Sequence, residues 1–317
     1  MTVLVTGATG FIGGHLAQRL VAEGERVRCL VRATSDTSLL DQLDVELVVG
    51  DLTDAASLAG VADGCEAVVH CGALVSDWAT TAEIAAINVT GTHNLLAAAS
   101  ATARFVHVST TDVHRGRNWY ARTKRAAEAE VRRAPNAVIL RPATVYGPRS
   151  TEVIGEIARA IRAGNMLLVD RGRAIAGLCY VDNLVDAALL ALGHDAAPGQ
   201  DFDITDGLDV TWRRLTDDLA AGLGAARVRW SLPYGVANAL GFALEHSYRL
   251  LRRTTGLTTR PLLSRQAVYV LGRDQDFANA KARALLGWEP RVGYAAGLEA
   301  TLAWLSEAPS AAPRRAG

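Results

Sequence analysis

The feature that most constrains the fold is the stretch Thr-Gly-Ala-Thr-Gly-Phe-Ile-Gly at residues 6–13, which directly follows an apolar, β-branched run. Gly7 permits a tight turn, Gly10 lets the backbone approach a pyrophosphate, and Gly13 lets the next helix pack close to the strand. A glycine-rich loop without a ligand would not need to lie between a predicted strand and a predicted helix. The stretch therefore predicts a turn that binds the phosphates of a dinucleotide.

The rest of the first half predicts a parallel sheet, because short apolar runs alternate with helical patterns. The expected strands are 2–6, 26–31, 45–50, 67–70, 105–110 and 137–141. The expected helices are 11–22, 55–61, 81–100 and 119–133. Six strands joined by right-handed crossovers give an α/β fold with a doubly wound parallel sheet.

After residue 148 the pattern is mixed and predicts a smaller, mostly helical lobe. The expected helices are 153–163, 182–192, 211–222 (with Thr211 or Asp209 as N-cap), 234–253 and 294–307, and the short strands are 175–181 and 201–205. No Pro/Ser linker separates two independent domains. We expect a dinucleotide-binding domain at 1–150, to which 174–205 returns, a substrate-binding lobe at 151–173 and 206–306, and a flexible tail at 307–317.

Composition makes several classes of protein improbable on physical grounds. The 317 residues carry 33 acidic and 33 basic side chains, so no basic field is available for a phosphodiester backbone and no nucleic-acid partner is expected. Four scattered cysteines without a Cys-x-x-Cys pair do not predict a disulfide framework or a zinc site. The N-terminus lacks a leader pattern and no apolar run is long enough to span a bilayer, so a cytoplasmic chain without a transmembrane segment is expected.

Two groups of polar residues have an ordinary and a functional interpretation. His70 and His107 lie on expected strands and are interpreted as packed, neutral histidines, and no cluster has metal-ligand spacing, so no metal is expected. At the end of the expected helix 234–253, Arg249, Arg252 and Arg253 could contact an anionic membrane surface, but a solvated helix end is favoured.

The end of the second expected strand distinguishes the two nicotinamide cofactors. An Asp or Glu there would hydrogen-bond the ribose 2′-hydroxyl, but this chain has Arg32, whose guanidinium can pair with a 2′-phosphate. We therefore expect NADP rather than NAD, unless Arg32 is one more solvated arginine among 31. Asp51 follows the third strand and could accept a hydrogen bond from the adenine amino group. Thr53 or Asp54 would serve better as the next N-cap, which leaves Asp51 free.

Lysine is scarce, since Lys124 and Lys281 are the only two. Lys124 lies four residues after Tyr120 in the expected helix 119–133, so the phenol and the ammonium share a face. A phenol is a poor acid–base catalyst at neutral pH, and a neighbouring ammonium favours the phenolate. The alternative is a surface pair, for which arginine would serve equally. The pair therefore predicts a catalytic tyrosine.

Together these motifs resemble those of the extended short-chain dehydrogenase/reductase family, which has a Rossmann fold. The resemblance runs from residue 1 to about residue 306, and residues 70–78 and 276–290 look most like the 3β-hydroxysteroid dehydrogenase and dihydroflavonol-reductase branch. The motifs follow the family's order: the glycine turn, 50–52 (Gly-Asp-Leu), 88–92 (Asn-Val-Thr-Gly-Thr), Tyr120 with Lys124, 141–147 (Arg-Pro-Ala-Thr-Val-Tyr-Gly) and 180–183 (Tyr-Val-Asp-Asn).

The resemblance implies a role for each of three catalytic residues. Tyr120 is the acid/base, Lys124 hydrogen-bonds the nicotinamide ribose, and Thr110, with Thr111 as second choice, polarises the substrate carbonyl. Hydride passes between C4 of the nicotinamide and the carbonyl carbon. Besides Gly7, Gly10, Gly13, Arg32, Asp51 and Lys124, the cofactor contacts implied are Thr9, Phe11, Ile12, Leu52, Cys71, Ala73, Pro142, Thr144 and Val145.

Two departures from the family pattern bear on the substrate. Thr110 and Tyr120 are ten positions apart (120 − 110), which is short for the family, so we expect a more open pocket or one closed by the second lobe. Where nucleotide-sugar members carry Arg-Asp-aromatic, this chain has Ala-Gly-Leu at 176–178. The expected enzyme interconverts a ketone and a secondary alcohol on a steroid-, terpenoid- or polyketide-like substrate. The alternatives are a nucleotide-sugar epimerase or dehydratase and a non-catalytic NADP-binding regulator. A homodimer is expected by family analogy.

Overall fold

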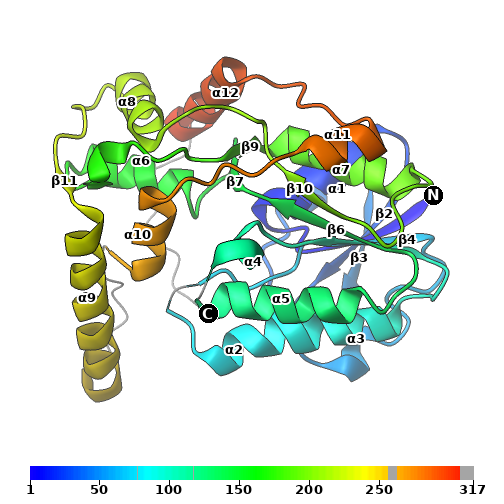
Figure 1. Cartoon of the computed structure of the whole chain (residues 1–317). Coiled ribbons are helices and arrows are strands. Elements are labelled where there is room, and N and C mark those ends of the chain that lie inside the picture. Colours follow the sequence, from blue (N-terminus) through cyan, green and yellow to red (C-terminus); the bar gives the residue numbers. More distant parts are fainter. Residues whose placement is uncertain (77, 117, 256–262, 308–317) are drawn as a thin grey trace. The chain divides into compact units, whose positions relative to one another are not determined.

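A computed structural model of the chain describes residues 1–76, 78–116, 118–255 and 263–307 (Figure 1). The backbone packs into two compact units. The first consists of Met1–Ala143, Val181–Asp206 and Phe277–Arg291; the second consists of Thr144–Tyr180, Gly207–Asp276 and the residues from Val292 onward. The expected tail at 308–317 lies outside the described residues.

The first unit is built on a seven-stranded parallel sheet with the strand order β10-β6-β5-β4-β1-β2-β3. The order runs outward from β1 in both directions, so the predicted doubly wound sheet is confirmed. The strands are β1 (Thr2–Thr6), β2 (Arg26–Val31), β3 (Val45–Val49), β4 (Ala67–His70), β5 (Arg104–Val108), β6 (Ala137–Pro142) and β10 (Asp201–Ile204).

Helices cover both faces of this sheet. Figure 1 shows α3 (Gly91–Ala98) and α5 (Trp119–Val131) side by side on one face. On the other face, α1 (Phe11–Ala22) contacts α7 (Val181–Gly193), where Arg19 Nη2 donates to Asp186 Oδ1 at 2.8 Å. The shorter elements of this unit are η1 (Leu40–Gln42), η2 (Ala55–Leu58), α4 (Asp112–Arg115) and α11 (Ala280–Leu286).

The prediction of one continuous helix at 81–100 is wrong at residues 86–90. A capping box between Thr80 and Glu83 starts α2 (Thr81–Ala85), but a π-helical turn, η3 (Ala86–Thr90), separates α2 from α3. The extra residue of a π turn changes which side chains face inward, and such turns recur at functional sites. Here the turn contains Asn88, whose side chain is buried. The expected helix at 55–61 is also shorter, because it forms only the 3-10 turn η2.

The second unit is mostly helical, with two short parallel strand pairs. β7 (Thr144–Tyr146) pairs with β9 (Leu178–Tyr180), and β8 (Leu168–Val169) pairs with β11 (Ser231–Leu232). Thr211 caps α8 by accepting a hydrogen bond from the Arg214 amide at 3.3 Å, which decides between Thr211 and Asp209. The helical elements are α6 (Ile154–Arg162), η4 (Asp170–Gly172), α8 (Trp212–Gly222), α9 (Tyr234–Thr255), α10 (Arg265–Gly272) and α12 (Tyr294–Glu307).

Each unit has its own apolar core. In the first, Leu4 of β1, Leu95 of α3 and Phe105 of β5 belong to one buried cluster formed by strands of the sheet and a helix that covers it. Burying such a side chain contributes about 1.5–3 kcal/mol. In the second, the fully buried Trp212 also donates its indole N–H to the Val270 carbonyl at 2.9 Å, so its polar atom is satisfied. No helix within the described ranges combines the length and apolarity needed to cross a bilayer.

Candidate dinucleotide-binding and catalytic site

The turn after β1 has the backbone geometry that its glycines were expected to permit. Gly7 lies at φ +68°, in the left-handed region that favours glycine. A Cβ on Gly7 would lie 2.9 Å from the carbonyl carbon of Cys71, and one on Gly13 would lie 2.3 Å from the Gly7 carbonyl oxygen. Side chains at these two positions would therefore separate β1 from its neighbouring strand end and from α1.

The N-terminus of α1 is open to an anion. Gly10 is the N-cap residue and provides no side-chain hydrogen bond, and the first turn contains no acidic residue. The first amides of a helix have no intrahelical partner and carry partial positive charge, which suits a phosphate group. Thr9, Phe11 and Ile12 are partly buried around this turn. These residues fit the pyrophosphate of a dinucleotide.

Arg32 and Asp51 lie at the ends of β2 and β3, at the same edge of the sheet. Arg32 is exposed. The expectation that Asp51 is free is wrong, because its Oδ1 accepts hydrogen bonds from the amide (2.8 Å) and hydroxyl (2.7 Å) of Thr53. These two bonds, with a smaller contribution from the charge of Arg32, hold the pKa of Asp51 below its usual range. Asp54, one of the two expected N-cap residues, caps η2 by accepting from the Ala56 amide.

The segment that follows β4 passes close to the glycine turn. The amide of Gly72 donates to Thr6 Oγ1 at 3.1 Å, and Cys71 and Ala73 on either side are partly buried. Burial raises the pKa of the Cys71 thiol to about 12, so it remains a neutral thiol at physiological pH. Leu52 is also partly buried. It lies so close to Gly91 that a Cβ built on Gly91 would be 2.8 Å from the Cβ of Leu52.

Tyr120 and Lys124 lie on α5 with the expected spacing of one helical turn. Asn118 caps the helix by accepting from the Ala121 amide at 2.8 Å, which places Tyr120 in the first turn, partly buried. Lys124 is only 2% exposed, and its Nζ donates to the Val108 carbonyl oxygen at 2.7 Å. Burial lowers the pKa of Lys124 to about 8. The amine is therefore held at the carboxyl end of β5.

Two neutral histidines pack beside this lysine, as predicted. The rings of His70 and His107 are 5.2 Å apart, and His107 Nε2 lies 3.3 Å from Lys124 Nζ. Burial lowers the pKa of His70 to about 3 and that of His107 well below its usual value. His70 is hydrogen-bonded by the hydroxyls of Thr6 (2.7 Å) and Thr92 (3.0 Å). His107 Nδ1 is buried without a hydrogen-bond partner among the described residues.

The two threonines after β5 differ in accessibility. Thr111 is buried, whereas Thr110 is partly buried, and its Oγ1 accepts a 3.2 Å hydrogen bond from the Asp112 amide at the start of α4. The short connection from Thr110 to α5 therefore contains one helical turn. Arg125 of α5 fixes this turn by donating to the carbonyl oxygens of Val113 (2.8 Å) and Gly116 (3.0 Å).

A buried ionic network behind these threonines was missed by sequence reasoning. Glu128, one turn after Lys124 on α5, accepts from the Ser109 hydroxyl at 2.7 Å. Both of its carboxylate oxygens also accept from Arg141 of β6, at 2.8 and 2.7 Å. Burial raises the pKa of Glu128, but the hydrogen bonds from Arg141 and Ser109 outweigh burial and hold it below its usual range. The network joins the end of β5 to α5 and β6.

Asn88 was part of a recognised motif, but its role was not predicted. Its Oδ1 accepts from the Leu74 amide at 2.7 Å, and its Nδ2 donates to the Leu74 carbonyl oxygen at 3.1 Å and to Thr123 Oγ1 at 3.3 Å. The side chain therefore fixes the segment after β4 and links it to α5. An asparagine in a predicted helix interior was the one sequence signal, since Asn is a weak helix former.

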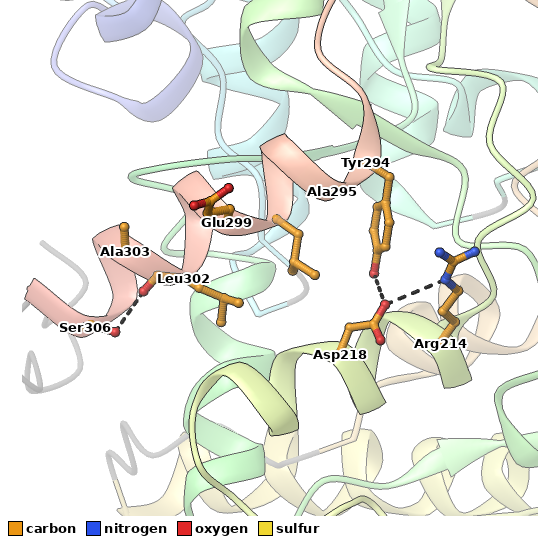
Figure 2. Close-up of a pocket in the computed structure, with 9 residues that line it drawn as sticks. Arg214, Asp218, Tyr294, Ala295, Glu299, Leu302, Ala303 and Ser306 are labelled. Carbon is orange, nitrogen blue, oxygen red and sulfur yellow. Dashed lines mark hydrogen bonds and ion pairs between the residues drawn. The ribbon is translucent and has the colours of Figure 1, made fainter.

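The remaining expected cofactor contacts lie further along the chain. Pro142 ends β6 and is buried, whereas Thr144 and Val145 lie in β7 of the second unit and are partly buried. A separate open cavity of about 540 Å³ lies between α8 and α12, with Tyr294 donating to Asp218 at 2.8 Å (Figure 2). None of the expected site residues lines this cavity. Within the described ranges no three His, Cys, Asp or Glu residues are grouped as metal ligands.

The doubly wound sheet, the open helix N-terminus after β1 and the Tyr–Lys pair on α5 define a dinucleotide-binding protein of the short-chain dehydrogenase/reductase class. The sequence model of the NAD dependent epimerase/dehydratase family matches residues 3–205, and the chain belongs to this family.

Two curated relatives and one solved structure show what the chain is similar to. It is 32% identical to the 4-hydroxy-2-methyl-3-oxo-4-farnesyl-3,4-dihydroquinoline-1-oxide ketoreductase of Stigmatella aurantiaca over 323 residues, 95% of each chain. It is 31% identical to the 3 beta-hydroxysteroid dehydrogenase/Delta 5→4-isomerase of Mycobacterium tuberculosis, over 91% of this chain and 86% of the relative. The UDP-glucuronic acid 4-epimerase of Bacillus cereus, solved in complex with NAD, shares the fold at 21% identity, with a TM-score of 0.74 over 97% of this chain and 99% of that one.

The predicted family resemblance is confirmed, including its 3β-hydroxysteroid dehydrogenase-like character. The chain is an NAD(P)-dependent oxidoreductase that acts between CH–OH and C=O groups.

Proposed function

We propose that this protein interconverts a ketone and a secondary alcohol on an apolar substrate, with NADP as cofactor and Tyr120 as the acid/base. The observation that carries the proposal is the position of Lys124, which is buried one helical turn from Tyr120 with its amine at the end of β5. A buried lysine is costly unless it has a task, because burial disfavours its charged form. A surface pair on α5, the alternative interpretation, would not bury the lysine.

Each residue of the site has a distinct role in this proposal. When bound, the cofactor supplies hydride transfer at the carbonyl carbon. In the reducing direction, Tyr120 donates its phenolic proton to the substrate oxygen, and Thr110 donates a hydrogen bond to the same oxygen. Lys124 stabilises the phenolate that remains and holds the nicotinamide ribose. Thr110 is preferred over Thr111 because the Thr111 side chain is buried.

The residues that would hold NADP lie along the carboxyl edge of the sheet. The amides at the start of α1 would bind the pyrophosphate. Arg32, exposed at the end of β2 where an acid would select NAD, would pair with the 2′-phosphate. Asp51 keeps a second carboxylate oxygen for the adenine amino group, since Thr53 engages only Oδ1.

An apolar substrate is supported by what two relatives are named for. One reduces a farnesyl-bearing quinoline ketone and the other is a hydroxysteroid dehydrogenase, so both names describe large apolar molecules. Neither relative identifies the substrate of this chain, and a steroid-, terpenoid- or polyketide-like molecule is the class that we propose.

The second candidate is a nucleotide-sugar epimerase or dehydratase, supported by the likeness in fold to the Bacillus cereus epimerase. Local packing at residues 176–178 argues against it. Ala176 and Leu178 are buried, and a Cβ on Gly177 would lie 2.2 Å from the Gln275 carbonyl oxygen. No aspartate side chain fits at Gly177, and buried Ala176 and Leu178 stand where nucleotide-sugar members carry the arginine and the aromatic residue, so the chain lacks all three side chains of this stretch.

The proposal is tested by incubating the protein with a panel of apolar ketones and NADPH or NADH. Turnover is measured as the loss of the reduced nicotinamide's absorbance at about 340 nm. Tyr120→Phe is expected to lower kcat by roughly 10²- to 10⁴-fold, as for removal of a positioned general acid. Tyr234→Phe in the second unit is the matched control and should leave kcat unchanged.

Three results would contradict the proposal. Unchanged turnover in Tyr120→Phe would exclude Tyr120 as the acid/base. Conversion of a nucleotide sugar without net NADPH consumption would favour the epimerase. Tight NADPH binding without turnover of any ketone, alcohol or nucleotide sugar would favour a non-catalytic regulator.

A further inference from the structure

Lys124 is held in the core by two acceptors, and one of them is a histidine side chain. Its Nζ donates to the Val108 carbonyl oxygen at 2.7 Å, and His107 Nε2 lies 3.3 Å from the same nitrogen. Both acceptors belong to consecutive residues of β5. The backbone acceptor is present whatever residue stands at position 108. The second acceptor exists only because residue 107 is a histidine.

The neighbouring His70 shows how a buried histidine is satisfied in this core. Thr92 Oγ1 donates to the Asn88 carbonyl oxygen at 2.8 Å, so its own proton is used and it accepts from His70 Nε2 at 3.0 Å. A neutral imidazole carries one proton, so His70 Nδ1 is the acceptor of the 2.7 Å bond from Thr6 Oγ1. Thr6 Oγ1 in turn accepts from the Gly72 amide at 3.1 Å. Both nitrogens of His70 are therefore paired, in one tautomer.

His107 differs from His70 because one of its ring nitrogens is unpaired. Its Nδ1 is buried and has no hydrogen-bond partner among the described residues, and the whole residue is 1% exposed. An unpaired polar atom in a core is unfavourable, and a leucine would fill this position without it. Among the same residues, the contact with Lys124 is the one hydrogen bond that the His107 side chain makes. This contact is what a histidine gains at position 107.

The protonation of the two groups sets the direction of this bond. Burial lowers the pKa of His107 well below its usual value, and the charge of Lys124 lowers it further, so the ring is neutral. A neutral ring accepts from an ammonium through its unprotonated nitrogen, which here is Nε2. A hydrogen bond to the ammonium favours the charged form of the lysine.

The other titratable groups on the strand side of Lys124 are uncharged at neutral pH. Burial lowers the pKa of His70 on β4 to about 3 and raises the pKa of the Cys71 thiol, just after β4, to about 12. The histidine is therefore neutral and the cysteine is a thiol. Neither group supplies an anion for the ammonium of Lys124.

On the helix side, Tyr120 lies one turn before Lys124 and Glu128 one turn after it. Burial lowers the pKa of Lys124 to about 8, and the charge of Glu128 opposes this effect. The carboxylate of Glu128 is already bonded to Arg141 of β6 and to the Ser109 hydroxyl. The side chain that bonds the ammonium directly is therefore His107.

We infer that His107 is a positioning residue, whose Nε2 accepts from the Lys124 amine and keeps that amine protonated at the carboxyl end of β5. The consequence for turnover rests on the proposed function, in which the ammonium of Lys124 favours the phenolate of Tyr120. Without His107, Lys124 would lose its proton at lower pH, and the phenolate would lose its neighbouring charge. The alternative is a histidine that only packs, for which leucine could substitute without any effect on Lys124.

The protonation of Lys124 can be measured directly, because the chain has only two lysines. The full chain, labelled with lysine that carries ¹³C at Cε, should give two NMR signals, and Lys281→Arg identifies the one from Lys124. A pH titration of this signal should give a pKa of about 8 in the wild type. In His107→Leu the acid dissociation constant of Lys124 should be roughly tenfold larger, because a hydrogen bond to the ammonium is lost.

Two further variants separate the hydrogen bond from packing. His107→Gln is the conservative variant, since Oε1 of a glutamine can replace Nε2 as the acceptor, and it should keep the acid dissociation constant of Lys124 close to that of the wild type. Val106→Ala is the control for lost packing. Val106 is fully buried, and its side chain leaves β5 on the face opposite to His107. This control should leave the titration of Lys124 unchanged.

The link to turnover has a separate readout in the same proteins. The pH profile of kcat/KM is measured for oxidation, by NADP, of the alcohol formed from the ketone that is reduced fastest in the panel above. The acidic limb of this profile should move to higher pH in His107→Leu, because the phenol of Tyr120 is then harder to ionise. It should return toward the wild-type position in His107→Gln.

Three outcomes would overturn the inference. These are an unchanged titration of Lys124 in His107→Leu, a His107→Gln variant that behaves like His107→Leu, and a Val106→Ala variant that shifts the titration of Lys124 as much as His107→Leu does. A shifted titration of Lys124 with an unmoved pH profile would support the inference and contradict the proposed role of Tyr120 and Lys124 in turnover.

Discussion

The buried Glu128–Arg141 ion pair is expected to hold α5, the helix that carries Tyr120 and Lys124, against the sheet. Glu128→Gln keeps the size of the side chain but removes its charge. The carboxylate now accepts four hydrogen bonds from three residues, namely Ser109, Arg141 (two bonds) and Arg132. After substitution one acceptor oxygen becomes an amide that faces a guanidinium donor.

The expected loss is about 3 kcal/mol of unfolding free energy. Breaking a buried ion pair from one side costs about 3–5 kcal/mol, because the remaining charge loses its partner. The lower end applies here, since Arg141 Nη1 also lies 2.5 Å from Asp201 Oδ2. Urea unfolding followed by far-UV circular dichroism measures the change. Glu130→Gln removes a more exposed pair with Arg133 on the same helix and should cost less than about 1 kcal/mol.

The pH dependence provides a second readout of the same pair. The pKa of Glu128 is lower in the folded chain, so its stabilisation is present above the unfolded pKa of about 4.3 and is lost as the pH falls through the folded value. The difference between wild type and Glu128→Gln should therefore be full at pH 7 and shrink below about pH 4.3. If Glu128→Gln cost no more than Glu130→Gln at pH 7, the pair would not hold α5 against the sheet.

Three further predictions concern the glycine turn, the lysine and the cofactor. Gly7→Ala and Gly24→Ala both place alanine at positive φ, but only at Gly7 would the Cβ meet backbone. We expect Gly7→Ala to lower the free energy of unfolding in urea by about 1–3 kcal/mol more than Gly24→Ala, and to weaken NADPH binding in a fluorescence titration. Equal losses of unfolding free energy in the two variants would contradict this geometry. Burial lowers the pKa of Lys124 in the folded chain to about 8, so the unfolded chain binds this proton more tightly. The unfolding free energy of the wild type, relative to that of Lys124→Met, should therefore rise between about pH 8 and pH 10.5. A difference that does not change with pH would show that Lys124 is not buried as described. Arg32→Ala should raise the KM for NADPH roughly tenfold or more while that for NADH changes little, and an unchanged ratio of the two would exclude Arg32 as the 2′-phosphate ligand.

Much of the sheet could be predicted because its determinants are local. β1, β2 and β4 have the predicted bounds, and the other predicted strands of the sheet differ by one or two residues at their ends. α1 and α12 also match the predicted bounds. Strand runs, helical periodicity and N-caps such as Thr211 depend on neighbours a few residues away, so the printed sequence contains them.

The errors have a common cause. The expected helix at 81–100 is broken by a π turn because Asn88 bonds Leu74, fourteen residues earlier. α10 was not expected, since Ser264 caps a helix of only eight residues whose support comes from α9. Asp51 was expected to be free, but its Oδ1 accepts hydrogen bonds from the amide and the hydroxyl of Thr53, two residues later. In each case a specific contact outweighed the propensity of the local sequence.

The sequence by itself determined the family, the phosphate-binding turn and the Tyr120–Lys124 spacing, because glycine conformations and helical periodicity are properties of short stretches. Only the tertiary structure decided that Lys124 is buried against Val108, and that Glu128 pairs with Arg141. These contacts join residues that are far apart in the chain and meet only when α5 lies against the sheet. Burial then shifts their pKa values, which no local pattern encodes.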